Sequence, residues 1–368
     1  MIAGLVAIVI ITIYFCWLLY LAIIWIANDT KQSIGEITIP VSIIIPCRNE
    51  EKTIAACIDS ISSQNYPKEL VELIVVNDHS EDDTINCIIK NNRVKLIQLP
   101  SHLKGKKAAL TEGIKNATHE LIITRDADTI SDVNWLRTII DEQIKADADM
   151  LICPVTLKSE NSFLNVFQRL EFYAFTILTG ATAFIKKPIL CNGANLCFKK
   201  SVFTKVDGYK GNDDLASGDD VFLMNKIAAL PERKILYLKD LNANVVTPAE
   251  DSFKRMTNQR LRWAGKNTRN PNLWNAFTGF CILLANISWL FIGVLSVFYH
   301  ELAGYFIIIT TIKCIIDFLL LFLGSTFHKQ GKALIAFPLM VVLYPIYIVL
   351  IAIMSLVIKP IWKGRSLK

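Results

Sequence analysis

Charged side chains are absent, or nearly so, from four long stretches of this 368-residue sequence. These stretches are residues 1–28, 273–299, 302–324 and 333–358. Each has room for the about 20 apolar residues with which a helix crosses the hydrocarbon of a bilayer. The whole sequence is 52% hydrophobic and still 20% charged, so the polar residues gather between these stretches. We therefore predict four membrane helices around a polar middle, which excludes an ordinary soluble enzyme.

The first stretch also lacks the basic residues and the small-residue cleavage site of a signal peptide, so we expect Ile2–Ala27 to stay as an anchor. In the third stretch, Lys313 and Asp317 are four residues apart and share a helical face. A lone charge in a bilayer is costly, so we expect these two to pair toward the protein interior. Their pairing is either structural or a contact to a polar acceptor. Pro338 and Pro345 are expected to kink the fourth stretch.

Several enzyme signatures are missing. The sequence contains no GxGxxG segment and no Walker loop, which argues against a dinucleotide enzyme and a P-loop ATPase. Its nine cysteines form no CxxC pair and no metal-binding spacing with histidine, so we expect reduced thiols.

Carboxylates are missing between Ser252 and His300, where basic residues cluster. The basic residues are Lys254, Arg255, Arg260, Arg262, Lys266 and Arg269. Basic residues beside a span favour the cytoplasmic side, so we expect a multi-pass protein of the cell (inner) membrane with its polar domain in the cytoplasm. No nucleic-acid-binding motif accompanies the cluster, and we expect no nucleic-acid partner.

These patterns divide the chain into four predicted parts. They are an anchor at 1–28, a cytoplasmic domain at 38–270, a membrane region of about three helices at 273–358, and a basic tail at 359–368. With residue 1 outside, three complete C-terminal spans would place the tail outside too, against the positive-inside tendency. Either one stretch is re-entrant or interfacial, or the tail is an exception.

The polar middle alternates short apolar runs with amphipathic segments. We predict strands at 41–46, 73–77, 94–99, 121–125 and 150–155, and helices at 50–62, 82–92, 106–116 and 132–145. This alternation is typical of an α/β domain with a mostly parallel sheet, in which ligands bind beyond the carboxyl ends of the strands. Farther on, Phe163, Phe167, Leu170 and Ala174 share a helical face, which indicates either core packing or a helix on the membrane surface.

Five segments in this region resemble, in order, the motifs of family 2 glycosyltransferases. They are residues 41–50, 75–80, 124–128, 217–220 and 259–263. The resemblance covers residues 40–265, and the flanking apolar stretches match the membrane-bound branch, which includes cellulose, chitin and hyaluronan synthases and ceramide glucosyltransferases. It implies a GT-A fold, a Rossmann-like α/β domain that binds a nucleotide-sugar.

The resemblance also implies a donor site. The departing diphosphate of such a donor is usually stabilised by a divalent cation together with Lys or Arg. Asp128 is the implied ligand of Mg²⁺ or Mn²⁺, and Asp126 contacts the metal or the nucleotide, with a solvated turn as the alternative. Asp78 is the implied uridine contact, and it can also cap the next helix.

Three more residues belong to this implied donor site. Lys106 begins a predicted helix, and the N-terminus of a helix favours anions. We therefore expect Lys106 to reach the diphosphate. The alternative is that it belongs to a solvated basic face. Arg48 and Glu50 follow the first strand and are expected to line the nucleoside pocket.

An inverting transfer needs a general base near the acceptor hydroxyl. Asp220 matches the family's base, and Asp219 is the alternative because it replaces the usual glutamate. The loop around Gly193 and Asn195 resembles the acceptor-side loop.

Gln259, Arg262 and Trp263 share one helical face. Arg262 is expected to bind the leaving diphosphate as a fork, and Gln259 and Trp263 to bind the acceptor. Membrane anchoring is the alternative role of the tryptophan.

The sequence therefore predicts a metal-assisted inverting glycosyltransferase that uses a nucleotide-sugar donor, with uridine as the favoured base. Its acceptor is predicted to be a membrane lipid or a saccharide. A processive synthase of poly-N-acetylglucosamine, chitin or hyaluronan is the main alternative. A non-catalytic membrane scaffold on the same fold is disfavoured by the carboxylates at all three strand ends.

Overall fold

The computed structural model describes residues 1–29, 37–211, 218–267, 272–358, 361–362 and 365–366. These residues divide into two compact units. The sheet unit comprises Asp29–Lys158 and Ala183–Ala249, and the helical unit comprises Met1–Asn28, Ser159–Thr182 and Glu250–Lys368. Ser217, Arg269 and the side chains of Lys266 and of the predicted basic tail lie outside the described residues. The predicted domain boundaries stay a prediction, although residues 159–182 and 250–267 group with the apolar helices.

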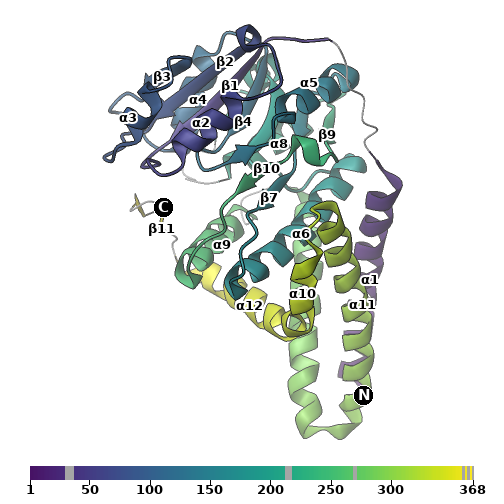
Figure 1. Ribbon diagram of the computed structural model, residues 1–368. Helices are drawn as coiled ribbons and strands as arrows, with labels where there is room; N and C mark the ends of the chain where they lie inside the picture. Colours follow the sequence, from purple (N-terminus) through teal and green to yellow (C-terminus); the bar gives the residue numbers. More distant parts are fainter. Residues whose placement is uncertain (30–36, 212–217, 268–271, 359–360, 363–364, 367–368) are drawn as a thin grey trace. The chain divides into compact units, whose positions relative to one another are not determined.

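The sheet unit is built on a seven-stranded sheet (Figure 1). In spatial order its strands are β3 (Val94–Gln98), β2 (Val71–Asn77), β1 (Val41–Cys47), β4 (Leu121–Arg125), β8 (Asn195–Lys199), β6 (Met150–Ile152) and β9 (Ile235–Tyr237). The first four are parallel, β6 and β9 are parallel, and β8 runs antiparallel to both of its neighbours. The prediction of a mostly parallel α/β sheet is confirmed.

This topology gathers chain ends at one edge of the sheet. The carboxyl ends of β1, β2 and β4 meet there because these strands are parallel neighbours. Strand β8 starts at the same edge, since Asn195 pairs with Arg125 in the antiparallel register. Ligands of α/β sheets bind at such an edge.

The predicted strand at 150–155 is wrong in its extent. It divides into β6 and β7 (Val155–Leu157), which belong to different sheets. Pro154 stands between them and has no N–H with which to continue a ladder. Strand β7 instead joins β10 (Val245–Thr247) and β5 (Ile130–Ser131) in a three-stranded sheet.

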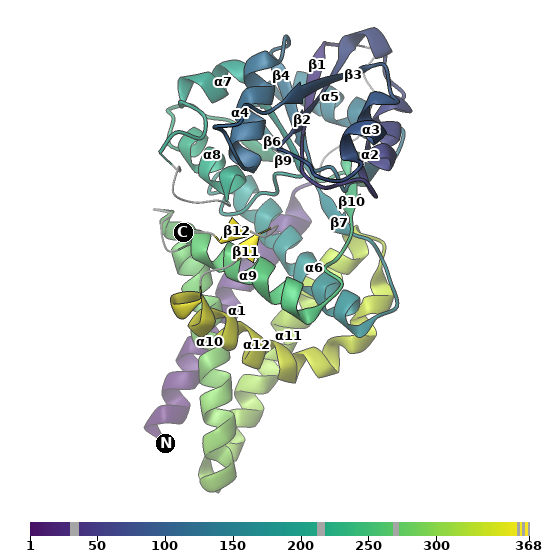
Figure 2. The same cartoon turned by 90° about the vertical axis from the view of Figure 1, so that its left-hand side faces the viewer.

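Helices flank the large sheet. Those of the sheet unit are α2 (Ile54–Ser62), α3 (Thr84–Ile89), α4 (Lys106–Asn116), α5 (Trp135–Ala146), α7 (Lys200–Lys205) and α8 (Asp219–Ala228), with 3₁₀ turns η1 (Lys68–Leu70) and η2 (Leu241–Ala243). Strand order runs outward from β1 to β3 and then returns to β4, so right-handed crossovers place α4 on the face opposite α2 and α3, as Figure 2 shows. Helix α4 coincides with the predicted helix at 106–116, while α2 and α3 are shorter than predicted.

In the described part of the helical unit, four helices are long and apolar enough to cross a membrane. They are α1 (Ile2–Ala27), α10 (Leu273–Phe298), α11 (Ala303–Phe327) with its leading turn η3 (His300–Leu302), and α12 (Phe337–Val357) with its leading turn η4 (Gly331–Ala336). Two more helices, α6 (Phe163–Phe184) and α9 (Phe253–Asn267), complete the unit, and the short strands β11 (Ile361–Trp362) and β12 (Arg365–Ser366) pair near the end of the chain. Pro338 lies in the first turn of α12, where proline is tolerated, and Pro345 lies inside the helix.

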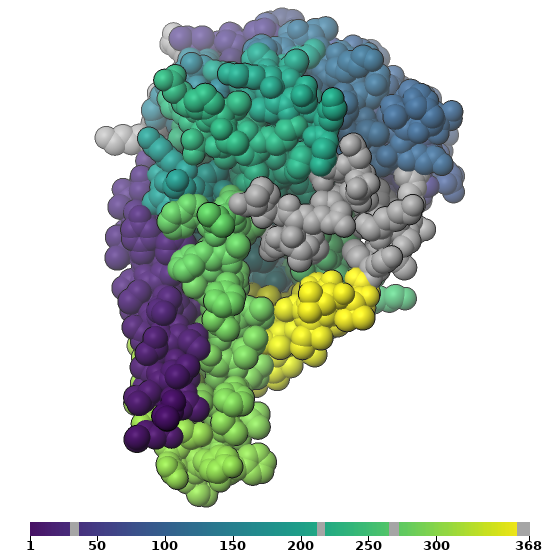
Figure 3. Space-filling view, turned by 180° about the vertical axis from the view of Figure 1, so that it is seen from behind, coloured from purple at the N-terminus to yellow at the C-terminus, as the bar shows by residue number. Residues whose placement is uncertain are grey.

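Helix α1 packs along α10 and α11, and Figure 3 shows it lying beside α10. The predicted pair of Lys313 and Asp317 is present, with the lysine side chain buried. Asp317 also accepts a hydrogen bond from the Tyr14 hydroxyl at 2.5 Å, which ties α11 to α1. This geometry agrees with the structural interpretation of the pair.

Two of the four residues that the sequence pattern places on one face of α6 pack in a core, whereas Phe163 is 43% exposed. Phe167, Leu170 and Tyr173 form a core cluster with Met256 of α9 and with residues of η4 and α12. Core packing is therefore the role of Phe167 and Leu170.

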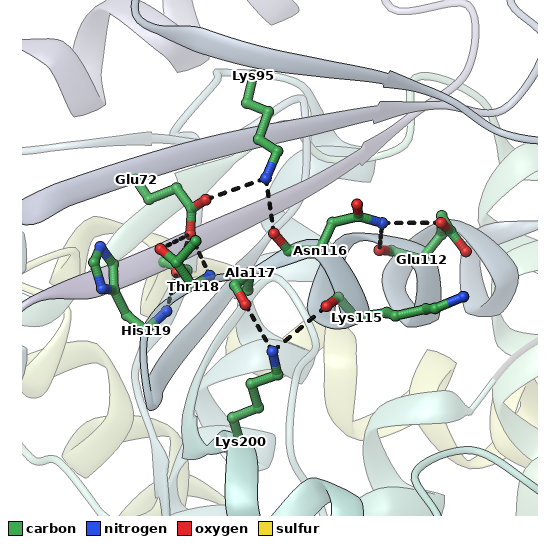
Figure 4. A network of polar contacts seen from close by, with 10 residues as sticks. Glu72, Lys95, Glu112, Lys115, Asn116, Ala117, Thr118, His119 and Lys200 are labelled. Carbon is green, nitrogen blue, oxygen red and sulfur yellow. Dashed lines mark hydrogen bonds and ion pairs between the residues drawn. The ribbon is translucent and has the colours of Figure 1, made fainter.

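Polar side chains hold the sheet together at the edge opposite the strand carboxyl ends (Figure 4). Glu72 accepts hydrogen bonds from the Ser42 hydroxyl at 2.5 Å and from the Thr118 backbone N–H at 2.8 Å. Lys95 pairs with Glu72 at 3.4 Å and donates to the Asn116 carbonyl at 2.8 Å, which caps the end of α4. Burial alone would raise the pKa of Glu72, but these hydrogen bonds outweigh burial and hold the pKa below its ordinary value.

We predict that Glu72→Gln lowers the midpoint of thermal unfolding of the sheet unit by several degrees near neutral pH. A hydrogen bond to a charged group contributes about 1.5–3 kcal/mol, and 1 kcal/mol shifts the midpoint by about 2–4 °C in a domain of this size. Because the folded-state pKa is depressed, the difference should vanish as the pH falls through that pKa, which lies below 4.5. Glu112→Gln is the control, because within the described residues the Glu112 carboxylate accepts from Asn116 of the same helix, α4. An equal loss in that variant would contradict the prediction.

Candidate active site

Four of the predicted site residues converge at the sheet edge. The Lys106 ammonium, at the start of α4, lies 2.5 Å from Oδ1 of Asp126, just after β4. Asp220, in the first turn of α8, accepts a hydrogen bond at Oδ2 from the Gly193 backbone N–H at 3.1 Å. A Cβ built on Gly193 would lie 3.4 Å from the Asp220 Cβ and 3.7 Å from the Lys106 Nζ, so the two pairs are neighbours.

Lys106 balances the negative charge of this cluster. Burial alone would lower the pKa of Lys106, but the carboxylates of Asp126, Asp219 and Asp220 outweigh burial and raise it. The lysine is therefore a fixed cation among three carboxylates, in the place where the sequence predicts the diphosphate contact.

Asp78 is tied to the same cluster through the backbone. It is the first residue after β2 and is buried, and its Oδ2 accepts from the N–H of Gly105 at 3.0 Å. Gly105 immediately precedes Lys106, so the ends of β2 and α4 are linked at the site. This contact anchors the loop before α4, a role that the sequence analysis did not predict.

Asp128 offers an oxygen for a cation. Among the described residues its Oδ1 is buried and has no hydrogen-bond partner. Burial, followed by the neighbouring charges of Asp126 and Glu50, raises the pKa of Asp128 to about 7. A divalent cation would supply the missing partner and neutralise the crowded carboxylates, so the side chains present fit the predicted metal.

The metal site is not ready-made within the described residues, because no three His, Cys, Asp or Glu side chains converge as ligands. Mg²⁺ and similar cations often use one or two carboxylates and complete their shell with substrate phosphates and water. Asp126 and Asp128 fit that arrangement.

Arg48 and Glu50 organise the loops that follow β1 and β2. Arg48 Nη1 donates to the carbonyls of Asp78 and His79 at 2.9 and 3.1 Å, and its Nη2 pairs with Glu81. Glu50 accepts from the Thr53 hydroxyl at 3.0 Å. Both residues lie at the correct edge, and their contact with a nucleoside stays a prediction.

Asp219 and Asp220 occupy the first turn of α8, where helix N–H groups attract negative charge. Gly218 precedes them with φ +91°, a left-handed backbone conformation that favours glycine. Asp219 is 6% exposed and Asp220 is more exposed, so Asp220 is the better placed of the two to meet a substrate.

Asn195 has a different environment. Its side chain is fully buried, accepts from the Trp135 indole N–H at 3.1 Å, and donates to the carbonyls of Pro154 and Ala243 at 2.7 and 2.8 Å. These bonds join β8 to the loops beside β7 and β10. Acceptor binding by Asn195 stays a prediction, and the structure shows an architectural role.

Gln259, Arg262 and Trp263 lie on α9 in the helical unit. Gln259 Nε2 donates to Oε1 of Glu250 at 2.8 Å. Arg262 and Trp263 are both partly exposed. The Trp263 ring lies 6.1 Å from the rings of Phe172 and Phe175 on α6, so an aromatic cluster surrounds it.

The sheet topology and the acidic edge of the sheet are those of the GT-A fold. The family follows from comparison, because residues 42–203 match the model described as glycosyl transferase family 2. The chain thus carries a family 2 glycosyltransferase domain.

Related proteins agree with this assignment. The chain is 27% identical over 272 residues to the poly-beta-1,6-N-acetyl-D-glucosamine synthase of Staphylococcus epidermidis, a match that covers 69% of this chain and 63% of the relative. It is 27% identical over 239 residues to the probable glycosyltransferase YdaM of Bacillus subtilis (strain 168), which covers 62% of this chain and 55% of the relative. The chain therefore spans between about half and two thirds of the length of these curated relatives.

Among solved structures, the mannosyltransferase PcManGT from Pyrobaculum calidifontis, in complex with GDP-Man and Mn²⁺, shares the fold. The TM-score is 0.66 at 18% identity, and the match covers 96% of this chain and 99% of that one.

We predict that Asp128→Asn stabilises the metal-free protein and that the gain depends on pH. Because the pKa of Asp128 is raised in the folded state, the protonated carboxyl contributes to the stability of the native protein below pH 3.8. The native protein loses this contribution as the pH rises to about 7, whereas Asp128→Asn does not. In EDTA, the difference between the thermal midpoints of Asp128→Asn and of the native protein should therefore grow from pH 3.8 to about pH 7 and stay constant above it. The expected gain is on the order of 1–3 kcal/mol, after allowance for partial exposure.

The exposed Asp132→Asn is the matched control for this measurement. A stability gain in Asp128→Asn that is the same at every pH, or a loss above pH 7, would show that the carboxylate is not penalised at the site.

Proposed function

We propose that the protein transfers a sugar from a nucleotide-sugar donor, expected to be UDP-linked, to a saccharide or membrane-lipid acceptor with inversion at the sugar. The observation that carries the proposal is the convergence of Lys106, Asp126, Gly193 and Asp220 at the carboxyl edge of the sheet. An ammonium group and two carboxylates meet there, and a backbone N–H holds one of the carboxylates. This combination suits a diphosphate leaving group beside a proton acceptor.

Each residue has a separate task in the proposed reaction. Asp220 takes the proton of the acceptor hydroxyl, and the Gly193 N–H holds one oxygen of its carboxylate in place. Lys106 contributes positive charge for the departing diphosphate. Asp78, Arg48 and Glu50 form the nucleoside side of the site.

Asp128 and Asp126 would hold the divalent cation, Mg²⁺ or Mn²⁺, which would neutralise the charge that develops on the diphosphate. On α9, Arg262 would add a second cation for the leaving group, and Gln259 and Trp263 would bind the acceptor. The four apolar helices would anchor the enzyme in the cell membrane, with the sheet unit on the cytoplasmic side.

Processive synthesis of a polymer such as poly-β-1,6-N-acetylglucosamine is the second candidate. The similarity to the synthase of Staphylococcus epidermidis favours it. Product length separates the two candidates: single transfer yields one added sugar per acceptor, whereas processive synthesis yields long chains before the acceptor is released.

We predict that Asp220→Asn lowers the rate of transfer by about 10²–10⁴-fold, the usual contribution of a general base. The purified variant in detergent should still bind UDP, as isothermal titration calorimetry can measure, because the base does not contact the nucleotide. Asp219→Asn tests the alternative base. Transfer by Asp220→Asn at the native rate, or a larger loss in Asp219→Asn, would overturn the assignment.

We predict that EDTA stops transfer and that added Mn²⁺ or Mg²⁺ restores it. Transfer is measured with a panel of labelled nucleotide-sugars, followed by separation of lipid from saccharide products. Asp128→Asn should require a metal concentration at least about tenfold higher, since loss of one of two carboxylate ligands weakens binding. Turnover that continues unchanged in EDTA would refute the metal.

A further inference from the structure

Five residues of the helical unit form a ring of contacts between α6 and α9, in which hydrogen bonds make every link except that between Gln168 and Glu171, which α6 itself joins. Gln168 Nε2 donates to the Glu250 carbonyl at 2.9 Å, and its Oε1 accepts from the Glu250 N–H at 3.0 Å. The Glu250 carboxylate accepts from Gln259, and the Gln259 Oε1 accepts from Arg260 Nη1. Arg260 closes the ring by donating from Nε and Nη2 to Oε2 of Glu171, at 2.8 and 2.5 Å.

Both ends of the ring lie on α6, since Gln168 and Glu171 are three residues apart on that helix. Figure 2 shows α6 and α9 side by side in the helical unit. One helix thus determines the placement of two neighbouring residues of the other, Gln259 and Arg260.

Arg260 contacts both the polar ring and Trp263. The guanidinium edges make the hydrogen bonds to Glu171 and Gln259, which fixes the plane of the group. Its central carbon lies over the Trp263 ring, 4.4 Å from the ring centroid. A planar cation held in this way fixes the plane of the aromatic ring that stacks on it.

Trp263 is thereby held from more than one side. The guanidinium covers part of one face, and Phe172 and Phe175 of α6 contact the ring at edge-to-face or tilted angles. The residue is still partly exposed, as a contact with a ligand requires. Sugar rings stack on an aromatic face of this kind.

The pair of Glu171 and Arg260 is not explained by stability alone. Their side chains are 3% and 4% exposed, and taking two charges out of water costs several kcal/mol that mutual attraction only partly offsets. An apolar pair of the same volume often supports a fold equally well. What an apolar pair does not supply is a planar cation at a fixed angle to Trp263.

We propose that Glu171 is a positioning residue for the acceptor: through Arg260 it sets the plane of Trp263, and through the ring it sets the amide of Gln259. The inference rests on the proposed function, in which Gln259 and Trp263 bind the acceptor. The ligand class is a saccharide whose ring lies on the indole and whose hydroxyl meets the amide.

Two variants test the proposal. Glu171→Gln keeps the size of the side chain but leaves the charge of Arg260 uncompensated. The double variant Glu171→Leu with Arg260→Met removes both charges and should keep a thermal midpoint near that of the native protein. Both should raise the KM for an added N-acetylglucosamine oligosaccharide by roughly 10- to 100-fold, as expected for misplaced binding groups, with the KM for UDP-N-acetylglucosamine unchanged.

The matched control is the double variant Asp251→Asn with Arg255→Gln. In the native protein these two residues form an ion pair at 2.7 Å, with Asp251 just before α9 and Arg255 on it, and their side chains are 67% and 68% exposed. This control should leave both KM values unchanged. If the double variant regains the native acceptor KM together with native stability, the pair is structural only and the proposal is overturned.

A second readout needs no activity. The emission of Trp263 is isolated by subtracting the spectrum of each protein that also carries Trp263→Phe. The Trp263 component should become more accessible to acrylamide in Glu171→Gln and in the double variant, but not in the control. An unchanged accessibility of Trp263 to acrylamide would overturn the positioning role, even if the protein transfers sugar normally. A native protein that transfers no sugar from any nucleotide-sugar would instead overturn the proposed function.

Discussion

The ammonium group of Lys106 is the interaction on which the candidate active site depends. Asp126, Asp219 and Asp220 surround it, and three carboxylates at one sheet edge would repel one another without a cation among them. The lysine is supplied by the first residue of α4, and Asp78 holds the preceding residue, Gly105, by its backbone N–H. The loop between β3 and α4 is therefore a structural partner of the carboxylates as well as a proposed ligand contact.

Much of the sheet could be predicted from the sequence because its central strands are continuous apolar runs. Strands β1, β2 and β4 are buried on both faces, so their Ile and Val residues stand out against the polar segments on either side. The antiparallel strand β8 has no such contrast, since Asn195 is its first residue and Lys199 its last. The separation of β6 from β7 depends on Pro154 and on the pairing of β7 with the distant strand β10, a partner that local periodicity does not reveal.

The site residues also differ in whether the sequence alone could place them. Asp126 and Asp128 directly follow a strand, and their place at the sheet edge follows from topology alone. The neighbourhood of Gly193 and Asp220 depends on two segments that are 27 residues apart and meet only in the folded unit. Glu171 and Glu250 carry no motif, so only their contacts with Arg260 and Gln259 identify them. A pattern of spacing finds residues that act through their position on one element, and it misses residues that act through a partner on another.

The two units position their polar groups by different physical means. In the sheet unit, backbone N–H groups at strand ends and helix starts hold the carboxylates, as Gly105 holds Asp78 and Gly193 holds Asp220. Backbone groups are rigid, so they hold these two carboxylates in fixed positions at the sheet edge. In the helical unit most backbone N–H groups of α9 donate hydrogen bonds within the helix, so side chains must fix the positions of the polar groups. The ring of charged and amide groups meets that need; its members Gln168, Glu171 and Arg260 are buried, and Glu250 and Gln259 are partly exposed. Where the ring is buried, a misplaced Arg260 or Glu171 would leave its partner unsatisfied, and this penalty keeps the pair, with the indole beside it, in a single arrangement.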